Sequence, residues 1–352
     1  MAFARVAVRP YVADMRNALD STAAAELPSG LYLNPILDAD FPDPAVILAG
    51  DGYYYAYATQ TLREDRWINI QVARSLDLIH WQNLGDALPE KPDWAQETQD
   101  FWAPSVLYDG TTYYMYYSAT PDVCHRPEAG HCLAVATSDT PAGPFVDMGM
   151  PLLLGAGFEY IDPMAFDDPA TGKRLLYWGS GFQPIKVQEL AEDRLSFAPE
   201  SAPIDLVWPN PVKGAFPRLV EAAWMVHHDD YYYLFYSGDN CCGPDAHYGV
   251  MVARSRSATG PFETLEQARG VPHSLMLFKC ERWLAPGHNC VIADKAGELW
   301  MLYHAIDVNR PRQRQEDEVN SRRVLLIDRI EWRHGWPHIG TPSDKPSSAP
   351  IV

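Results

Sequence analysis

A run of aromatic and β-branched residues recurs five times along the 352-residue chain. Runs of this composition are typical of β-strands, because bulky side chains pack well on a pleated surface. Their first residues lie 60, 62, 56 and 68 positions apart, and four of the runs follow an acidic or glycine-containing turn. The sequence therefore contains a repeat with loops of variable length. The runs span residues 53–57, 113–117, 175–178, 231–236 and 299–303.

Each repeat contains about four strand candidates. After the aromatic run comes another candidate, such as residues 72–75, 135–138 or 252–255, and then a short segment with a further aromatic residue. Units of four strands repeated around an axis make a β-propeller. We therefore predict an all-β fold, a five-bladed β-propeller whose four-stranded antiparallel blades surround a central channel.

The extent of the repeats predicts the domain boundaries. The propeller is expected over residues 34–339, preceded by an N-terminal extension over residues 1–33. Helical periodicity is limited to a short candidate around residues 12–25. Residues 340–352 carry prolines and serines, so we expect a poorly ordered C-terminal tail.

Composition argues against several classes of partner. The chain has 28 Lys and Arg against 46 Asp and Glu, a net charge of −18, whereas a nucleic-acid partner needs clustered positive charge. No stretch reaches the roughly 20 apolar residues of a transmembrane helix, so no membrane partner is expected. Charged residues interrupt the first 20 residues, where a secretory signal needs an apolar run, and we expect a cytoplasmic protein. The six cysteines lack the paired spacing of a zinc site and are expected to be reduced and mostly structural.

A short segment before each aromatic strand would form the innermost strand of its blade. Ten to thirteen positions before the five runs stand Asp43, Ala103, Asp162, Glu221 and His288. If the repeats superpose, these residues form a ring around the channel. Singly, each is a turn or strand-entry residue, because Asp-Pro is a common turn signal. Together, three carboxylates and a histidine favour a functional cluster, since converging like charges destabilise a fold unless function or a cation requires them.

The order of the ring suggests acid–base chemistry on a sugar. Asp162 neighbours Glu221, so its charge would raise the pKa of Glu221 and favour a protonated general acid. Asp43 would face Glu221 across the channel with room for a water between base and sugar, the geometry of inverting glycosidases. His288 falls between them, where it would either hold a cation or form hydrogen bonds inside a crowded channel.

Motifs in all five repeats resemble glycoside hydrolase family 43. The resemblance spans residues 34–339, and it rests on the order and spacing of the motifs rather than on any one of them. These motifs are Phe41-Pro42-Asp43-Pro44, Trp102-Ala103-Pro104, Ile161-Asp162-Pro163, Gly287-His288-Asn289, Tyr303-His304-Ala305, Ile330-Glu331-Trp332 and Gly335-Trp336-Pro337.

The resemblance implies a five-bladed catalytic propeller and inverting hydrolysis of arabinofuranosides or xylosides. It implies that Asp43 is the general base, Glu221 the general acid, and Asp162 the residue that tunes and orients the acid. His288 matches an axial histidine that often binds calcium through waters. Arg323 matches an arginine that contacts the carboxylates or the sugar, with Arg322 as the alternative.

Two positions depart from the family pattern. The family usually has Gly-Pro after the acid, whereas Ala222 and Ala223 follow Glu221 here. Ser105 stands where an acidic residue commonly follows Trp-Ala-Pro, a position that bears on the sugar subsites.

Aromatic residues near the channel are candidate platforms for a sugar ring. We expect this of Phe41, Trp67 and Trp102, whereas Trp283 is better explained by core packing. The stretch 309–320 is expected to be a solvated loop that could border the pocket.

The main functional hypothesis is an inverting, exo-acting glycoside hydrolase that releases terminal β-D-xylose or α-L-arabinofuranose from short xylo- or arabino-oligosaccharides. An endo- or exo-α-1,5-L-arabinanase is the alternative within the same chemistry. A non-catalytic carbohydrate-binding propeller is the alternative from another class, because a fold alone never proves activity.

Overall fold

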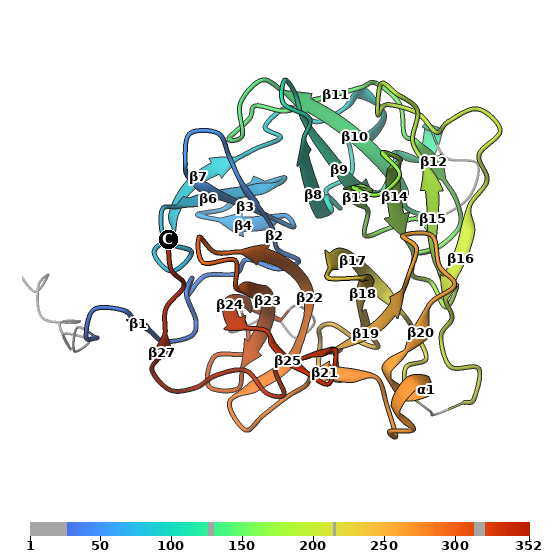
Figure 1. Ribbon diagram of the computed structural model, residues 1–352. Coiled ribbons are helices and arrows are strands. Elements are labelled where there is room, and N and C mark those ends of the chain that lie inside the picture. Colours follow the sequence, from blue (N-terminus) through green and yellow to red (C-terminus); the bar gives the residue numbers. More distant parts are fainter. Residues whose placement is uncertain (1–26, 126–129, 214–215, 313–320) are drawn as a thin grey trace, which may run out of the picture.

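A computed structural model describes residues 27–125, 130–213, 216–312 and 321–352. Five antiparallel sheets stand around a common centre, each built from consecutive stretches of the chain (Figure 1). The prediction of a five-bladed, all-β propeller is therefore confirmed. The helix expected around residues 12–25 lies outside the described residues. Within the described ranges, no helix is long and apolar enough to span a membrane.

The blades follow one another in chain order. The first blade contains β2 (Ala45–Leu48), β3 (Tyr54–Ala58), β6 (Gln71–Ser75) and β7 (Gln82–Asp86). The second contains β8 (Trp102–Tyr108), β9 (Tyr113–Ala119), β10 (Cys132–Ser138), β11 (Val146–Asp147) and β12 (Leu153–Leu154). The third contains β13 (Met164–Asp167), β14 (Arg174–Trp178), β15 (Ile185–Glu189) and β16 (Ile204–Val207).

The last two blades carry the longest inner strands. The fourth contains β17 (Glu221–His228), β18 (Tyr231–Gly238), β19 (Gly249–Ser255), β20 (Glu263–Thr264) and β21 (Leu275–Leu277). The fifth contains β22 (Trp283–Ala293), β23 (Leu299–Asp307) and β24 (Arg323–Arg329). Outside the blades, the described residues also form two hairpins, one strand pair that joins the segments before and after the blades, and three short helices. These are β4 (Thr61–Arg63) with β5 (Arg66–Ile68), β25 (Glu331–Arg333) with β26 (Trp336–His338), β1 (Leu31–Tyr32) with β27 (Ser347–Ser348), η1 (Asp93–Ala95), η2 (Val123–His125) and α1 (Leu265–Arg269).

The aromatic runs form the second strands, whose side chains fill the spaces between blades. Tyr57 and Tyr117 lie in one cluster with residues of both the first and the second blade. Tyr57 meets Phe145 edge to face, with ring centroids 6.1 Å apart. The buried Tyr117 hydroxyl donates to Asp147 over 2.7 Å. The repeat seen in the sequence is thus the packing unit that holds neighbouring blades together, because each ring buries a large apolar area and its hydroxyl finds a partner.

Three blades differ from the four-stranded prediction: the second and fourth contain an additional short strand, and the fifth contains three strands. Residues before the first blade run along the free edge of β24 instead. Backbone N–H groups of Ile36 and Leu37 donate to Leu325, and that of Phe41 donates to Arg323. Chain segments nearly 300 residues apart therefore join the first blade to the fifth and close the propeller.

The C-terminal tail, expected to be poorly ordered, is anchored to the propeller. Strand β27 pairs with β1. Ser343 donates its backbone N–H to the buried Asp328 carboxylate, which also accepts hydrogen bonds from Tyr303 and Tyr32. The expectation was wrong because composition alone does not reveal a buried carboxylate that needs donors.

Candidate active site

A ring of residues in the left-handed backbone conformation lies at or just before the start of four inner strands and within the fifth, β22. Their φ angles are 56° at Asp43, 47° at Ala103, 60° at Asp162, 57° at Ala222 and 47° at His288. Four of the five residues predicted to share a register do so. In the fourth blade the structure puts Ala222 in the ring, and Glu221 stands one residue earlier. Spacing alone missed this, because a residue with positive φ leaves no signal when it is alanine.

The ring is fixed by hydrogen bonds from one blade to the next. Four of these backbone N–H groups donate to a side chain near the end of the preceding blade's second strand. The pairs are Asp43 with His304 Nδ1 (3.1 Å), Ala103 with Thr59 Oγ1 (2.8 Å), Asp162 with Ser118 Oγ (3.0 Å) and His288 with Ser237 Oγ (3.0 Å). In the third blade Gly179 follows the aromatic strand and offers no side chain. There the Asp162 carboxylate accepts the N–H of Ala222 at 3.1 Å, which fixes this carboxylate beside Glu221.

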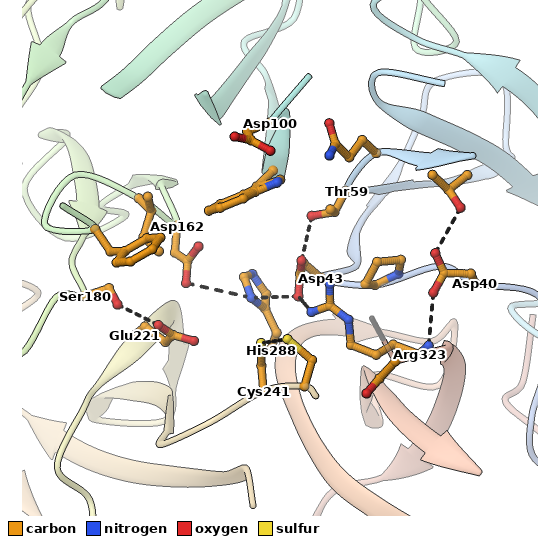
Figure 2. A pocket seen from close by; sticks show the side chains of 18 of the residues that line it. Asp40, Asp43, Thr59, Asp100, Asp162, Ser180, Glu221, Cys241, His288 and Arg323 are labelled. Atoms are coloured by element: carbon orange, nitrogen blue, oxygen red, sulfur yellow. Dashed lines mark hydrogen bonds and ion pairs between the residues drawn. The ribbon is translucent and has the colours of Figure 1, made fainter. Parts of the chain in front are cut away.

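A cavity of about 700 Å³ opens over the ring (Figure 2). This volume is within the range of small-molecule sites, roughly 300–1,000 Å³. Carboxylates, amides and aromatic rings line it together. They include Asp40, Asp43, Gln60, Trp67, Gln99, Asp100, Trp102, Phe158, Asp162, Ser180, Glu221, Cys241, Cys242, His288 and Arg323.

Asp43 is surrounded by donors. Thr59 Oγ1 donates to Oδ2 over 2.6 Å, and Arg323 Nη1 donates to Oδ1 over 2.9 Å. Burial by itself would raise the pKa of Asp43, but the positive charge of Arg323, with help from His288 and His304, holds it well below the ordinary value. This carboxylate is therefore ionised at neutral pH.

Arg323, rather than Arg322, is the arginine of the cavity. Its backbone N–H donates to Asp40 over 3.0 Å while its guanidinium holds Asp43. Arg322 instead pairs with Asp38 at 2.6 Å, and neither of these two residues lines the cavity.

Glu221 has a different environment. Ser180 Oγ donates to one carboxylate oxygen over 2.6 Å, and the Tyr248 hydroxyl donates to the other over 2.7 Å. Burial outweighs these two hydrogen bonds and raises the pKa of Glu221 to about 7. Tyr248 lies against Gly287, where an added Cβ would come within 2.1 Å of its ring. Glycine is therefore required there for the tyrosine to reach Glu221.

Asp162, like its neighbour Glu221, has a raised pKa. Burial, followed by the charge of Glu221, raises the pKa of Asp162 well above its ordinary value. Two buried carboxyl groups that interact in this way titrate as a pair, so the pair retains a proton near neutral pH. The pKa of Glu221 shifts in the expected direction, but burial is the main cause, and the carboxylate charge that adds to it is that of Asp43 rather than that of Asp162.

His288 bridges the two sides of the site. Its Nδ1 lies 3.3 Å from Asp43 Oδ1 and 3.8 Å from Asp162 Oδ2. Burial lowers the pKa of His288, so the ring is neutral at pH 7. Among the residues that the structure describes, no three His, Cys, Asp or Glu side chains gather to hold a metal ion. Calcium binding through His288 and waters, which the family resemblance implies, stays a prediction.

The candidate sugar platforms divide into two groups. Trp67 is 45% exposed and lines the cavity, as does Trp102. Trp102 lies nearly parallel to Phe158, at 14° with centroids 6.2 Å apart, so these rings form one apolar wall. Phe41 is 1% exposed and packs in the core between the first and fifth blades, so its prediction as a platform was wrong. Trp283 is fully buried in the core, as expected.

Several residues that hold the carboxylates of the site were not predicted from the sequence. Ser180 and Tyr248 hold Glu221, and Thr59 holds Asp43, yet each lies outside the inner strands that were compared. A recurring Thr or Ser at the end of the aromatic strands was a usable signal for Thr59. Of the loop 309–320, residues 313–320 lie outside the described residues, while the adjoining Ser321 lines the cavity.

Comparison with known proteins agrees with this architecture. The family described as Glycosyl hydrolases family 43 matches residues 32–337. A protein of Aspergillus flavus named probable arabinan endo-1,5-alpha-L-arabinosidase A is 29% identical, over 84% of this chain and 90% of that protein. A xylan 1,3-beta-xylosidase of a Vibrio species is 27% identical, over 88% of this chain and 57% of that protein. The crystal structure of a thermostable family-43 glycoside hydrolase has a TM-score of 0.72 at 26% identity, covering 91% of this chain and 99% of that one. Since the family match spans most of the chain and all five blades, this protein belongs to glycoside hydrolase family 43.

Proposed function

We propose that this glycoside hydrolase cleaves α-1,5-linked L-arabinan or its oligosaccharides with inversion at the anomeric carbon. The observation that carries the chemistry is the contrast between two carboxyl groups in one cavity. The pKa of Asp43 is held low by Arg323, while burial raises that of Glu221 to about 7. Near neutral pH one group accepts a proton and the other donates one, which is what glycoside hydrolysis requires.

The roles follow from these protonation states. Ionised Asp43 takes a proton from a water as that water attacks the anomeric carbon. Protonated Glu221 gives its proton to the departing glycosidic oxygen. Asp43 precedes the first blade's inner strand and Glu221 begins the fourth's, so the two groups approach the cavity from non-adjacent blades. Inverting enzymes leave room for the water by keeping these groups about 6.5–9.5 Å apart.

Three residues support these two. Arg323 keeps Asp43 ionised and fixes its orientation. Burial and the charge of Glu221 raise the pKa of Asp162, whose carboxylate is itself fixed by the Ala222 N–H. Trp102 and Phe158 provide a flat apolar wall on which the face of a sugar ring would stack.

The substrate assignment is supported by the relatives. The Aspergillus protein, named for cleavage of 1,5-linked arabinan, matches over nearly its whole length. The Vibrio protein, named for xylan, matches over little more than half of its length. The arabinanase alternative is thus better supported than an exo-acting xylosidase or arabinofuranosidase. Release of xylose remains the second candidate because of the Vibrio match.

A substrate panel tests the proposal. Debranched arabinan, α-1,5-arabino-oligosaccharides, xylo-oligosaccharides and nitrophenyl pentosides are incubated with the enzyme, and the products are separated by chain length. We expect turnover of the α-1,5-linked substrates. A ladder of oligomers indicates endo action, and arabinose alone indicates exo action. Turnover of xylo-oligosaccharides only would refute the arabinan assignment, and no turnover on any substrate would favour the non-catalytic alternative.

Stereochemistry tests the mechanism separately. Proton NMR of freshly released sugar should show the β-anomer from an α-linked arabinofuranoside before mutarotation. Initial appearance of the α-anomer would require a covalent intermediate and would overturn the role of Asp43 as base.

A further inference from the structure

The mechanism leaves two thiols in the cavity wall without a role. Cys241 and Cys242 follow β18 on the loop that leads to β19, and both line the cavity with the carboxylates (Figure 2). Their sulfur atoms are 2.7 Å apart and share a hydrogen bond. We propose that Cys241 and Cys242 form a redox-active dithiol that peroxide oxidises to a disulfide between neighbouring residues, and that this oxidation slows glycoside hydrolysis.

The surroundings make Cys241 a hydrogen-bond donor and Cys242 a nucleophile. The hydrogen bond from Cys241, aided by the positive charge of Arg323 and opposed by burial, lowers the pKa of Cys242 to about 6. The same hydrogen bond, with burial, raises the pKa of Cys241. Near neutral pH the pair therefore holds one thiolate and one thiol in contact. A thiolate beside a second thiol is the arrangement that favours disulfide formation over further oxidation.

The chemistry balances with hydrogen peroxide as oxidant. The Cys242 thiolate attacks one peroxide oxygen and the O–O bond breaks, so Cys242 becomes a sulfenic acid and the departing hydroxide takes a proton to form one water. The Cys241 sulfur then attacks the Cys242 sulfur, the S–O bond breaks, and the hydroxide leaves with the Cys241 thiol proton as a second water while the S–S bond forms. Overall, two thiols and one hydrogen peroxide give one disulfide and two waters, and two electrons pass from sulfur to oxygen.

The remaining four cysteines provide an internal comparison. Cys132 and Cys290 are buried, and burial raises the pKa of each thiol. Cys124 is exposed and Cys280 is half-buried. None of these four has a neighbouring cysteine in the sequence. Selective oxidation is therefore expected at positions 241 and 242.

Disulfide formation is expected to disturb the acid. The loop is tied down on both sides, since Gly243 donates its N–H to Ser321 over 2.9 Å and His247 donates to Asn240 over 3.0 Å. It ends at Tyr248, whose hydroxyl holds Glu221. Cys241 also packs against the small apolar cluster that contains Tyr248. Formation of the disulfide reorients both cysteine side chains, and we expect this to displace Tyr248 and its hydrogen bond to Glu221.

Differential alkylation with mass spectrometry tests the site on the intact enzyme. The protein is treated with hydrogen peroxide, free thiols are capped with iodoacetamide, and disulfides are then reduced and capped with N-ethylmaleimide. We expect N-ethylmaleimide on Cys241 and Cys242, and iodoacetamide on Cys124 and Cys280. Iodoacetamide on Cys241 and Cys242 after peroxide treatment would overturn the site. This readout does not depend on the substrate, so its failure is distinct from failure of the proposed function.

Variants test the link to catalysis. The Cys241→Ser and Cys242→Ser variants should be insensitive to peroxide, whereas Cys124→Ser should respond like the wild type. Circular dichroism checks that each variant folds. On the substrate that the panel identifies, we expect peroxide to lower the wild-type kcat severalfold and dithiothreitol to restore it. Unchanged turnover by an enzyme shown to carry the disulfide would overturn the link to catalysis.

Discussion

Burial and one neighbouring positive charge determine which of the two carboxyl groups holds a proton. Asp43 accepts from Arg323 and Thr59, and the charged donor stabilises its ionised form. Glu221 accepts from two neutral hydroxyl groups in a buried position, which stabilise its charge less than burial destabilises it. Because their surroundings differ, one carboxyl group is suited to accept a proton and the other to donate one.

Removal of the acid should affect substrates unequally. In Glu221→Ala we expect turnover of arabino-oligosaccharides to fall by about 10²–10⁴-fold, the usual contribution of general acid catalysis. Nitrophenyl arabinofuranoside should lose much less, because its leaving group departs without a proton. The ratio of kcat/KM values for the two substrates measures this. The exposed Glu192→Ala is the control, and equal losses on both substrates would remove Glu221 from the acid role.

Tyr248 is expected to set the upper pH limit of activity. Its hydroxyl stabilises ionised Glu221, so Tyr248→Phe should raise the pKa of Glu221 further. The acid then keeps its proton to higher pH, and the basic limb of the kcat/KM profile moves upward from about pH 7. Tyr177→Phe is the matched control, because its hydroxyl donates to Ala258 in the core. A basic limb that stays in place would show that Tyr248 does not act through Glu221.

The inner strand of each blade is the element that carries the site. A left-handed residue lies before or within each inner strand, and β17 contains a register shift between Glu221 and Trp224. This irregularity turns the Glu221 side chain toward Ser180 and Tyr248. Alanine is an unfavourable residue at the left-handed position, because its Cβ approaches the following carbonyl oxygen.

Glycine at position 222 should therefore stabilise the protein. The left-handed conformation destabilises the folded state by roughly 1–2 kcal/mol when the residue is alanine. Glycine avoids this strain, but it loses about 0.5–1 kcal/mol more conformational entropy than alanine on folding. We expect Ala222→Gly to increase the free energy of unfolding by about 0.5–1 kcal/mol in a denaturant titration. Ala223→Gly is the control and should destabilise, because residue 223 has no positive φ. A loss of stability in Ala222→Gly would contradict the strain argument.

The predictive value of the sequence differed between elements. The second strands were predicted correctly because their aromatic composition and spacing both recur. The inner strands were predicted less well, since Ala222 has no side-chain signal for its conformation and Phe41 points into the core although Asp43, two residues later, lines the cavity. Tyr248 and Ser180 reach Glu221 from loops, and no periodicity governs a loop. Contacts between distant segments, such as that of Arg323 with Asp43, came from resemblance to a family.

At the scale of the whole molecule, the axis of the propeller is where we expect a cation. We expect calcium to bind near His288 with waters as its other ligands, and such binding is modest and reversible. Exhaustive chelation should lower both activity and melting temperature, and added calcium should restore them. His288→Ala should not respond to the chelator, whereas the exposed His273→Ala should respond like the wild type. An unchanged melting temperature and activity after chelation would mean that His288 is only a hydrogen-bonded residue of the channel.

The contacts between the first and last blades can form only late in synthesis of the chain. Asp43 and its partner Arg323 are 280 positions apart in the chain. At about 5–20 residues per second, a ribosome needs roughly 15–60 seconds to reach the arginine after it has made the aspartate. During that interval the first blade exists without the guanidinium that ionises its carboxylate and without the strand along which residues 36–41 run. A nascent chain is therefore inactive until its last blade emerges, and hydrolysis reports that synthesis of the propeller is complete.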